Sequence, residues 1–175
     1  MKFLISLSPV LICLLFLSCK DKKEQKLSGK WQEVAVINPQ LDKAIHDQQI
    51  FADTVGSATT AEQNKALYGT DNIDTMRAAL NKNLDSFRRA QLMAIKATRF
   101  DFRDNGILYI NSNEGIDSSN WYLEEDGALI LDRAKLKGSG TKKRMEVLEL
   151  SDTLLKLGFT ENYINSTAIF KPIKK

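Results

Sequence analysis

The sequence predicts a mostly β protein: an eight-stranded antiparallel up-and-down barrel with α-helices inserted between the first two strands. One β pattern lies before residue 40, and seven more follow residue 97. Short turns separate most of these later patterns, as in antiparallel sandwiches and barrels. The intervening stretch, about residues 39–97, has apolar residues at the three- and four-residue steps of a helix.

The N-terminus is predicted to be an export signal, so residues 1–18 are excluded from the fold. Lys2 gives a positive start, and residues 3–17 are mostly apolar. Fifteen helical residues cover about 22 Å, short of the ~30 Å hydrocarbon core of a bilayer. Pro9 also interrupts the run. A charged start, a short apolar core and the small residue Ser18 are typical of a secretory signal peptide.

The cysteine that follows this run indicates lipidation. Phe16-Leu17-Ser18-Cys19 resembles the cleavage and lipidation box of bacterial lipoproteins. The resemblance implies that Cys19 is acylated and binds the protein to a lipid bilayer. An ordinary cleaved signal is the alternative, and it would leave an odd cysteine in an exported chain. The run after Cys19 is rich in lysine rather than acidic, so we expect an outer-membrane lipoprotein that faces the periplasm rather than the cell surface.

A short spacer leads from Cys19 to the folded domain. Residues 19–26 contain no large apolar side chain, so we expect a lipidated tether that is disordered or extended. The domain itself is predicted over residues 27–175. Its first strand is Lys30–Ile37, which is rich in Trp, Val and Ile.

The entry to this strand carries a family resemblance. Gly29-Lys30-Trp31 resembles the G-x-W that opens the first strand of lipocalins and their relatives. Together with the seven later strands, residues 27–171 resemble the lipocalin-like domain of small Gram-negative lipoproteins, a calycin-type barrel with a helical insertion. The resemblance implies that Gly29 and Trp31 form the closed end of the barrel.

The insert is predicted to hold three helices, at residues 41–51, at residues 60–68 and after a cap at Asp71. The third carries an apolar stripe that includes Met76, Leu80, Leu84 and Phe87. In lipocalin-type barrels the link between the first two strands overhangs the open mouth. The resemblance therefore implies a lid whose stripe faces a ligand, and packing of the helices on the outer wall is the alternative.

The second half of the chain has the alternation of half-buried strands. Phe100 and Phe102 fall on one face of residues 98–103, and Asn105-Gly106 then favours a type I′ turn. The remaining strands are predicted at residues 107–111, 120–124, 128–132, 144–150, 153–159 and 166–171, with a flexible loop at residues 137–140.

Residues with catalytic or metal-binding chemistry are few. His46 is the single histidine, and after cleavage Cys19 is the single cysteine, so we predict no metal and no cofactor. No Ser–His–Asp set has spacing support, and we predict no enzyme. The net charge is only +3, with acidic and basic residues interleaved, so nucleic acid is not an expected partner.

Two functions of different class fit these observations. In the first, the barrel holds a small apolar or amphipathic ligand beneath the lid, with Phe100, Phe102 and Trp121 among its contacts. In the second, the barrel is filled with side chains, and its helices or loops bind another envelope protein. Eight-stranded barrels are just wide enough for either arrangement. The carrier is our main expectation, and the interaction or inhibitor module is its alternative.

Overall fold

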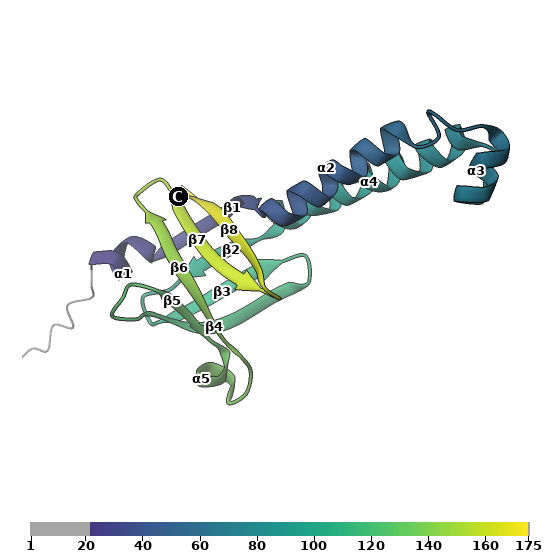
Figure 1. The fold of residues 1–175 in the computed structure, drawn as a ribbon. Coiled ribbons are helices and arrows are strands. Elements are labelled where there is room, and N and C mark those ends of the chain that lie inside the picture. Colours follow the sequence, from purple (N-terminus) through teal and green to yellow (C-terminus); the bar gives the residue numbers. More distant parts are fainter. Residues whose placement is uncertain (1–21, 175) are drawn as a thin grey trace, which may run out of the picture.

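The computed structural model describes residues 22–174 (Figure 1). Its eight strands form one closed barrel in which every neighbouring pair is antiparallel and β8 returns to β1. The predicted up-and-down barrel is therefore confirmed. The strands are β1 (Gly29–Ile37), β2 (Arg99–Phe102), β3 (Ile107–Ser112), β4 (Gly115–Leu123), β5 (Leu129–Asp132), β6 (Lys142–Leu150), β7 (Leu155–Glu161) and β8 (Ile164–Pro172).

Tight turns join the strands where the sequence indicates them. The β2–β3 hairpin is confirmed: Gly106 has φ +78°, and its N–H donates to the carbonyl of Arg103 at 3.1 Å. The predicted type I′ turn is wrong, because Asn105 does not take positive φ; Gly106 alone is left-handed, as after a type I turn. The β7–β8 turn places Asn162 and Tyr163 at φ 50° and 64°. Two successive positive φ values are typical of a type I′ turn, whose twist matches that of the flanking strands.

One compact cluster fills most of the barrel. Because side chains alternate along each strand, the inward positions of all eight strands meet at the barrel axis. Aromatic rings dominate the centre. The ring centroids of Phe100 and Phe170 are 4.7 Å apart, and those of Phe102 and Trp121, which pack edge to face, are 5.2 Å apart. The buried members are Leu27, Trp31, Phe100, Phe102, Leu108, Trp121, Leu129, Leu131, Met145, Leu155, Leu157, Ala168 and Phe170.

A short helix, α1 (Lys22–Leu27), precedes the barrel, so the prediction of an extended tether is wrong from Lys22 onward. The cause is Leu27, which is fully buried against the barrel core. The Ser28 N–H donates to the carbonyl of Glu24 at 3.0 Å, which continues the helical bonding into β1. Burial of Leu27 thus fixes the polar residues before it, which form α1, against the barrel.

The predicted helices between β1 and β2 are confirmed as α2 (Pro39–Thr54), α3 (Ala61–Tyr68) and α4 (Ile73–Ala97). Polar caps define their starts, as the physics of unpaired N–H groups requires. Thr60 and Gln63 form a capping box on α3. On α4 the cap is Asn72, which accepts from the Thr75 N–H, rather than the predicted Asp71.

The helices α2 and α4 form an antiparallel hairpin that extends away from the barrel, with α3 at its far tip (Figure 1). Polar contacts join the two helices along their length. The Gln49 amide donates to Asn81 at 2.9 Å, and Arg88 donates to the Gln49 carbonyl oxygen at 3.1 Å. Nearer the tip, Arg77 Nε donates to the backbone carbonyl of Val55 at 2.9 Å.

Two features of the second half differ from the sequence prediction. The strand β4 begins at Gly115, five residues before the predicted start, because polar residues there do not alternate with apolar ones. The predicted loop is preceded by a one-turn helix, α5 (Arg133–Lys137). Its signals are Asp132 as N-cap and Gly138 as a left-handed C-cap. A five-residue helix is too short to show an apolar period.

Candidate functional site

The two ends of the barrel differ in structure. At one end α1 lies beside the start of β1, and the Trp31 Nε1–H donates to the carbonyl of Leu27 at 2.9 Å. Trp31 is 3% exposed, and Gly29 reaches φ +129° at the first position of β1. These predicted barrel-end residues therefore lie at the end closed by α1. The hairpin leaves from the other end, beside the β3–β4, β5–β6 and β7–β8 connections, and we call this end the open end because α1 does not cover it.

Toward the open end the inward-facing residues become polar. Glu33, Ser119 and Ser166 are each less than 10% exposed, although they belong to three different strands. The Ser166 hydroxyl accepts a hydrogen bond from the Asn38 amide at 3.2 Å, and Ser119 donates to the carbonyl of Asn120 at 2.9 Å. The barrel interior thus grades from an apolar closed half to a polar open half.

Glu33 is the most unusual group in this open half. Burial raises the pKa of its carboxyl to about 7, and a hydrogen bond from the Thr98 hydroxyl only partly offsets that rise. Within residues 22–174 no Lys or Arg forms an ion pair with Glu33. A nearly buried carboxyl without a cation is unfavourable for folding, and such groups are concentrated at functional sites.

Half-buried apolar residues lie on other strands of the barrel. Ile110, Val147 and Phe159 pack on the edge of the core cluster from three different strands. At the rim, Lys143 Nζ lies 4.8 Å from the centre of the Phe159 ring and 3.6 Å from the carboxylate of Glu161. We call Glu33, Ser119, Ser166, Ile110, Val147 and Phe159 the mouth residues.

The opposite side of the rim is held by ion pairs from α5. Arg133 and Lys137 both bind the carboxylate of Asp117, an inward-facing residue at the start of β4. The hydrogen bond from Lys137 is the main cause that lowers the pKa of Asp117. Asp117 therefore stays ionised at neutral pH, whereas Glu33 is close to half protonated.

The sequence prediction did not single out Glu33, but a signal was present. Because Trp31 points into the barrel, the period of two along Lys30–Ile37 places Glu33 inside as well. A β-bulge between Glu33 and Ala35 then shifts the register, so that Val36 pairs with the buried Ala168. The alternation was readable up to Glu33, and the bulge beyond it was not.

The predicted aromatic ligand contacts lie in the packed core instead. Phe100, Phe102 and Trp121 are 7%, 1% and 5% exposed and touch one another and Phe170. A ligand would reach them only by displacing core side chains.

The predicted lid is wrong. Met76, Leu80, Leu84 and Phe87 lie on the part of α4 that extends away from the barrel (Figure 1). The physical reason is how α4 ends: the Gln32 amide donates to the carbonyls of Lys96 and Thr98, each at 3.0 Å, and fixes the last turn to β1. An unbroken helix of this length spans about 37 Å, so its other end lies far from the mouth.

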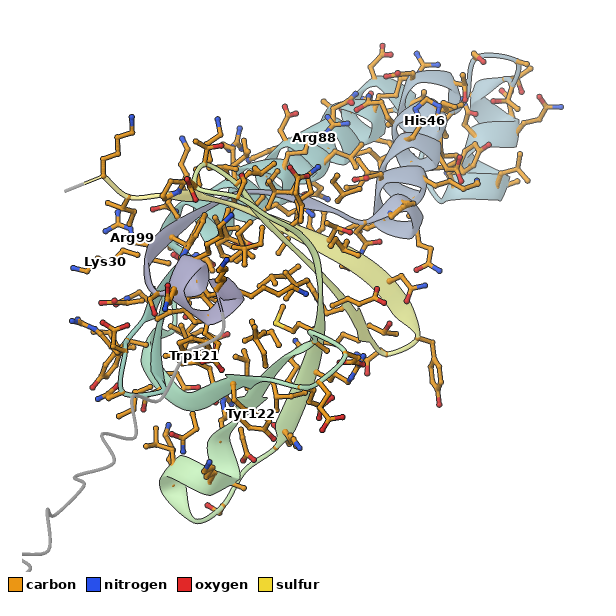
Figure 2. The ribbon with its side chains drawn as sticks, turned by 90° about the vertical axis from the view of Figure 1, so that its left-hand side faces the viewer. Lys30, His46, Arg88, Arg99, Trp121 and Tyr122 are labelled. Atoms are coloured by element: carbon orange, nitrogen blue, oxygen red, sulfur yellow. The ribbon has the colours of Figure 1, made fainter. Side chains whose placement is uncertain are left out.

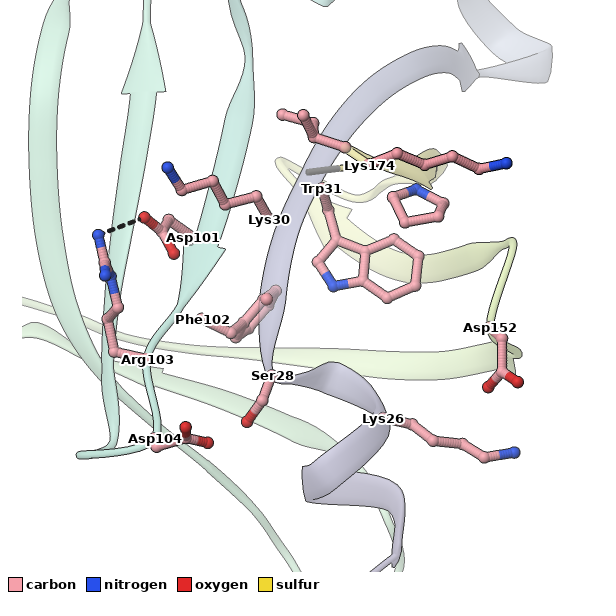
Figure 3. A pocket seen from close by; sticks show the side chains of 13 residues that line it. Lys26, Ser28, Lys30, Trp31, Asp101, Phe102, Arg103, Asp104, Asp152 and Lys174 are labelled. Atoms are coloured by element: carbon pink, nitrogen blue, oxygen red, sulfur yellow. Dashed lines mark ion pairs between the residues drawn. The ribbon is translucent and has the colours of Figure 1, made fainter.

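Two larger hollows each have a volume of about 650 Å³, and the first reaches the core residues Trp31 and Phe102. One is at the closed end beside α1, where Lys26, Lys30 and Lys174 alternate with Asp101 and Asp152 (Figure 3). The other follows the outer wall of β6, β7 and β8, over Gly158 and beneath Leu148.

The remaining sequence candidate, His46, lies on the hairpin near Arg88 and away from Trp121 in the barrel (Figure 2). In the described part of the chain no three metal-ligating side chains cluster. Residues 22–174 also include no helix long and apolar enough to cross a membrane. Cys19, the predicted lipidation site, lies outside the described residues.

Comparisons with known proteins identify no family. No family model matches the chain, and no curated protein matches it. A solved DUF4847 family protein from Bacteroides vulgatus aligns with 87% of this chain and 98% of its own, at 12% identity and a TM-score of 0.45. Bovine odorant binding protein, solved in complex with undecanal, aligns with 89% of this chain and 76% of its own, at 14% identity and a TM-score of 0.37. Scores this low say nothing about the function of this chain.

Proposed function

We propose that this chain is a lipid-anchored, non-enzymatic binding protein of the cell envelope that takes a small amphipathic ligand at the open mouth of its barrel. The observation that carries the proposal is Glu33, a carboxyl only 9% exposed that has no cationic partner within residues 22–174. Ligand sites characteristically combine apolar walls with a few well-placed polar groups. The mouth residues have this composition.

The ligand's chemistry follows from the two halves of the barrel. The closed half is packed with side chains, so the ligand is short and stays within the open half. Its apolar part lies against Ile110, Val147 and Phe159, and its polar end donates hydrogen bonds to Glu33. An amine or a hydroxyl group satisfies this requirement, because an ionised carboxylate only accepts hydrogen bonds.

The anchor is compatible with an accessible mouth. The lipidation box ends at Cys19, three residues before α1 begins. Because α1 lies at the closed end, opposite the hairpin, a bilayer attached through Cys19 leaves the mouth free (Figure 1). This arrangement fits an anchor in the outer membrane, and we propose that the protein faces the periplasm.

Association with a protein is a second candidate function, and the hairpin favours it. Six of the large apolar residues exposed on the surface lie there: Ile50, Phe51, Leu67, Phe87, Leu92 and Met93. Exposed apolar groups that gather on one projecting element mark interaction surfaces more often than scattered ones do.

Native mass spectrometry of the protein extracted from its host's membranes tests the proposal. We expect a chain that begins at Cys19, carries acyl groups and holds a small noncovalent ligand. Cys19→Ala is the matched control, and it should lose the acyl mass and the membrane association. An acylated chain that is always free of ligand would refute the carrier but keep the anchor. An unacylated chain cleaved elsewhere would refute the anchor alone.

A further inference from the structure

The charged residues of α4 are confined to one side of the helix. At 100° per residue, all seven fall within about 140° of its circumference. They are Asp74, Arg77, Lys82, Asp85, Arg88, Arg89 and Lys96. A solvated helix distributes its charges more evenly, so the uncharged side of α4 requires an explanation.

That side carries a regular row of residues, which we call the uncharged stripe. Its members recur at alternating steps of four and three, the spacing of a coiled-coil seam. They are Met76, Leu80, Asn83, Phe87, Ala90 and Ala94. Phe87 is 43% exposed, and Met93 beside the stripe is 64% exposed. The stripe is thus an apolar seam of the kind that another helix covers.

The partner helix of the hairpin does not cover this seam. Asn81 and Arg88, which bond to Gln49 of α2, lie about 120° around the helix from the stripe. Leu84, the most buried residue in the middle of α4, lies on the same side as these two residues. Ala90 and Ala94 remain exposed, whereas Met76 and Leu80 nearer the tip are half-buried. One face of α4 therefore binds α2, and within residues 22–174 the members of the stripe from Asn83 to Ala94 stay exposed.

The stripe is complementary in size to itself when reversed. Met76 and Leu80 stand at its start and Ala90 and Ala94 at its end, with Asn83 and Phe87 between, so two antiparallel copies pair a larger with a smaller residue in each layer. Met76 meets the partner's Ala94, Leu80 meets the partner's Ala90, and Phe87 meets the partner's Asn83. The neighbouring row follows the same rule: Met93 meets the partner's Ala79, and Ser86 faces the two-fold axis. Alternating large and small residues is how facing helices reach native packing density.

We propose that a second copy of this chain is the occupant, bound through antiparallel α4 helices about a two-fold axis near Ser86. A symmetric interface uses the same surface on both subunits, which the reversed stripe satisfies. A parallel pair would set Phe87 against Phe87 and Ala94 against Ala94, crowding one layer and leaving a void in another. The dimer does not depend on a ligand at the mouth.

Sedimentation of the lipoprotein in density-matched detergent measures the association. We expect a dimer for the wild type and a monomer for Ala90→Arg, which places a charge in the seam. Ala78→Arg is the matched control on the charged side of the same helix, and it should remain dimeric. Both positions are exposed, so neither change disturbs the core. A wild type that is monomeric up to about 100 μM overturns the proposal, as does equal loss in both variants.

Cysteine cross-linking in native membranes tests the direction of pairing. Chains with Ala79→Cys and chains with Met93→Cys should form a disulfide-linked pair when co-expressed, and neither should cross-link strongly alone. The wild type gives the background. Cross-linking of each variant with itself would show parallel pairing and overturn the antiparallel model. Capture of a different protein by a monomeric chain would assign the stripe to a heterologous partner instead.

Discussion

Replacing Trp31 with alanine is expected to lower the free energy of unfolding by about 3–5 kcal/mol, because it leaves a large cavity in a core that cannot close over it. Trp31 is 3% exposed, and its indole N–H also binds the carbonyl of Leu27 at 2.9 Å. Its loss removes both the packing of the closed end and the bond that holds α1. Urea denaturation followed by far-UV circular dichroism measures the change.

Two further variants separate packing from hydrogen bonding. Trp31→Phe keeps most of the apolar volume and loses the indole N–H, so we expect a smaller loss that includes about 1 kcal/mol for the hydrogen bond. Leu67→Ala removes an apolar side chain that is 65% exposed on α3 and should change stability by no more than about 0.5 kcal/mol. A denaturation midpoint for Trp31→Ala that equals the wild-type midpoint would show that this end of the barrel is not packed as described.

Glu33→Gln is expected to raise stability above pH 7 by about 3 kcal/mol and to change it little near pH 4. Burial raises the pKa of Glu33 from 4.5 to about 7, so the folded chain keeps a proton that the unfolded chain releases. Between these two pH values the folded state therefore binds more protons, and stability falls as pH rises. Glutamine never ionises, so the variant lacks this loss. Urea denaturation at several pH values gives the comparison.

The matched control is Glu146→Gln on the outer wall of β6, where the carboxylate is exposed. Its stability curve should follow the wild type at every pH. If the free energy of unfolding of Glu33→Gln also changes with pH as the wild type's does between pH 4 and 8, the Glu33 carboxyl is not buried as described.

The barrel was predictable because its signals are local. Alternation at Phe100 and Phe102 and the Asn105-Gly106 turn specify strands and hairpins over a few residues. Seven such strands follow one another closely after the helical insert and one precedes it, which leaves few arrangements other than a closed antiparallel sheet. The α2, α3 and α4 helices were predictable for the same reason, since each combines a polar cap with an apolar period.

The direction of the hairpin could not be predicted, because tertiary contacts at its base decide it. The apolar stripe of α4 indicates a helix with a buried side, but it does not say what covers that side. The hydrogen bonds from Gln32 to the carbonyls of Lys96 and Thr98 hold the end of α4 against β1 and so set the direction of the hairpin. Gln32 lies 64 residues from Lys96 in sequence, and no local pattern reports such a contact.

The candidate site was missed for a related reason. In the sequence Glu33 looks like an ordinary surface residue of a half-buried strand. It is unusual only because its carboxyl is buried without an ion pair within residues 22–174. Large aromatic side chains at inward positions suggest ligand contacts, so the sequence favours Phe102 and Trp121 over Glu33. Trp121 and Phe102 instead pack on each other at 5.2 Å and fill the closed half.

Titration with two fluorescent probes of equal chain length, a short-chain alkyl amine and the corresponding carboxylic acid, tests the central claim most directly. At pH 8 the wild type should bind the amine and bind the acid more weakly, because an ionised Glu33 attracts the first and repels the second. Glu33→Gln should weaken amine binding by about tenfold, the value of one charge-assisted hydrogen bond, while Glu146→Gln should leave it unchanged. Equal affinity of the wild type and Glu33→Gln for the amine, or no binding of either probe by the folded protein, would contradict a ligand site at the mouth.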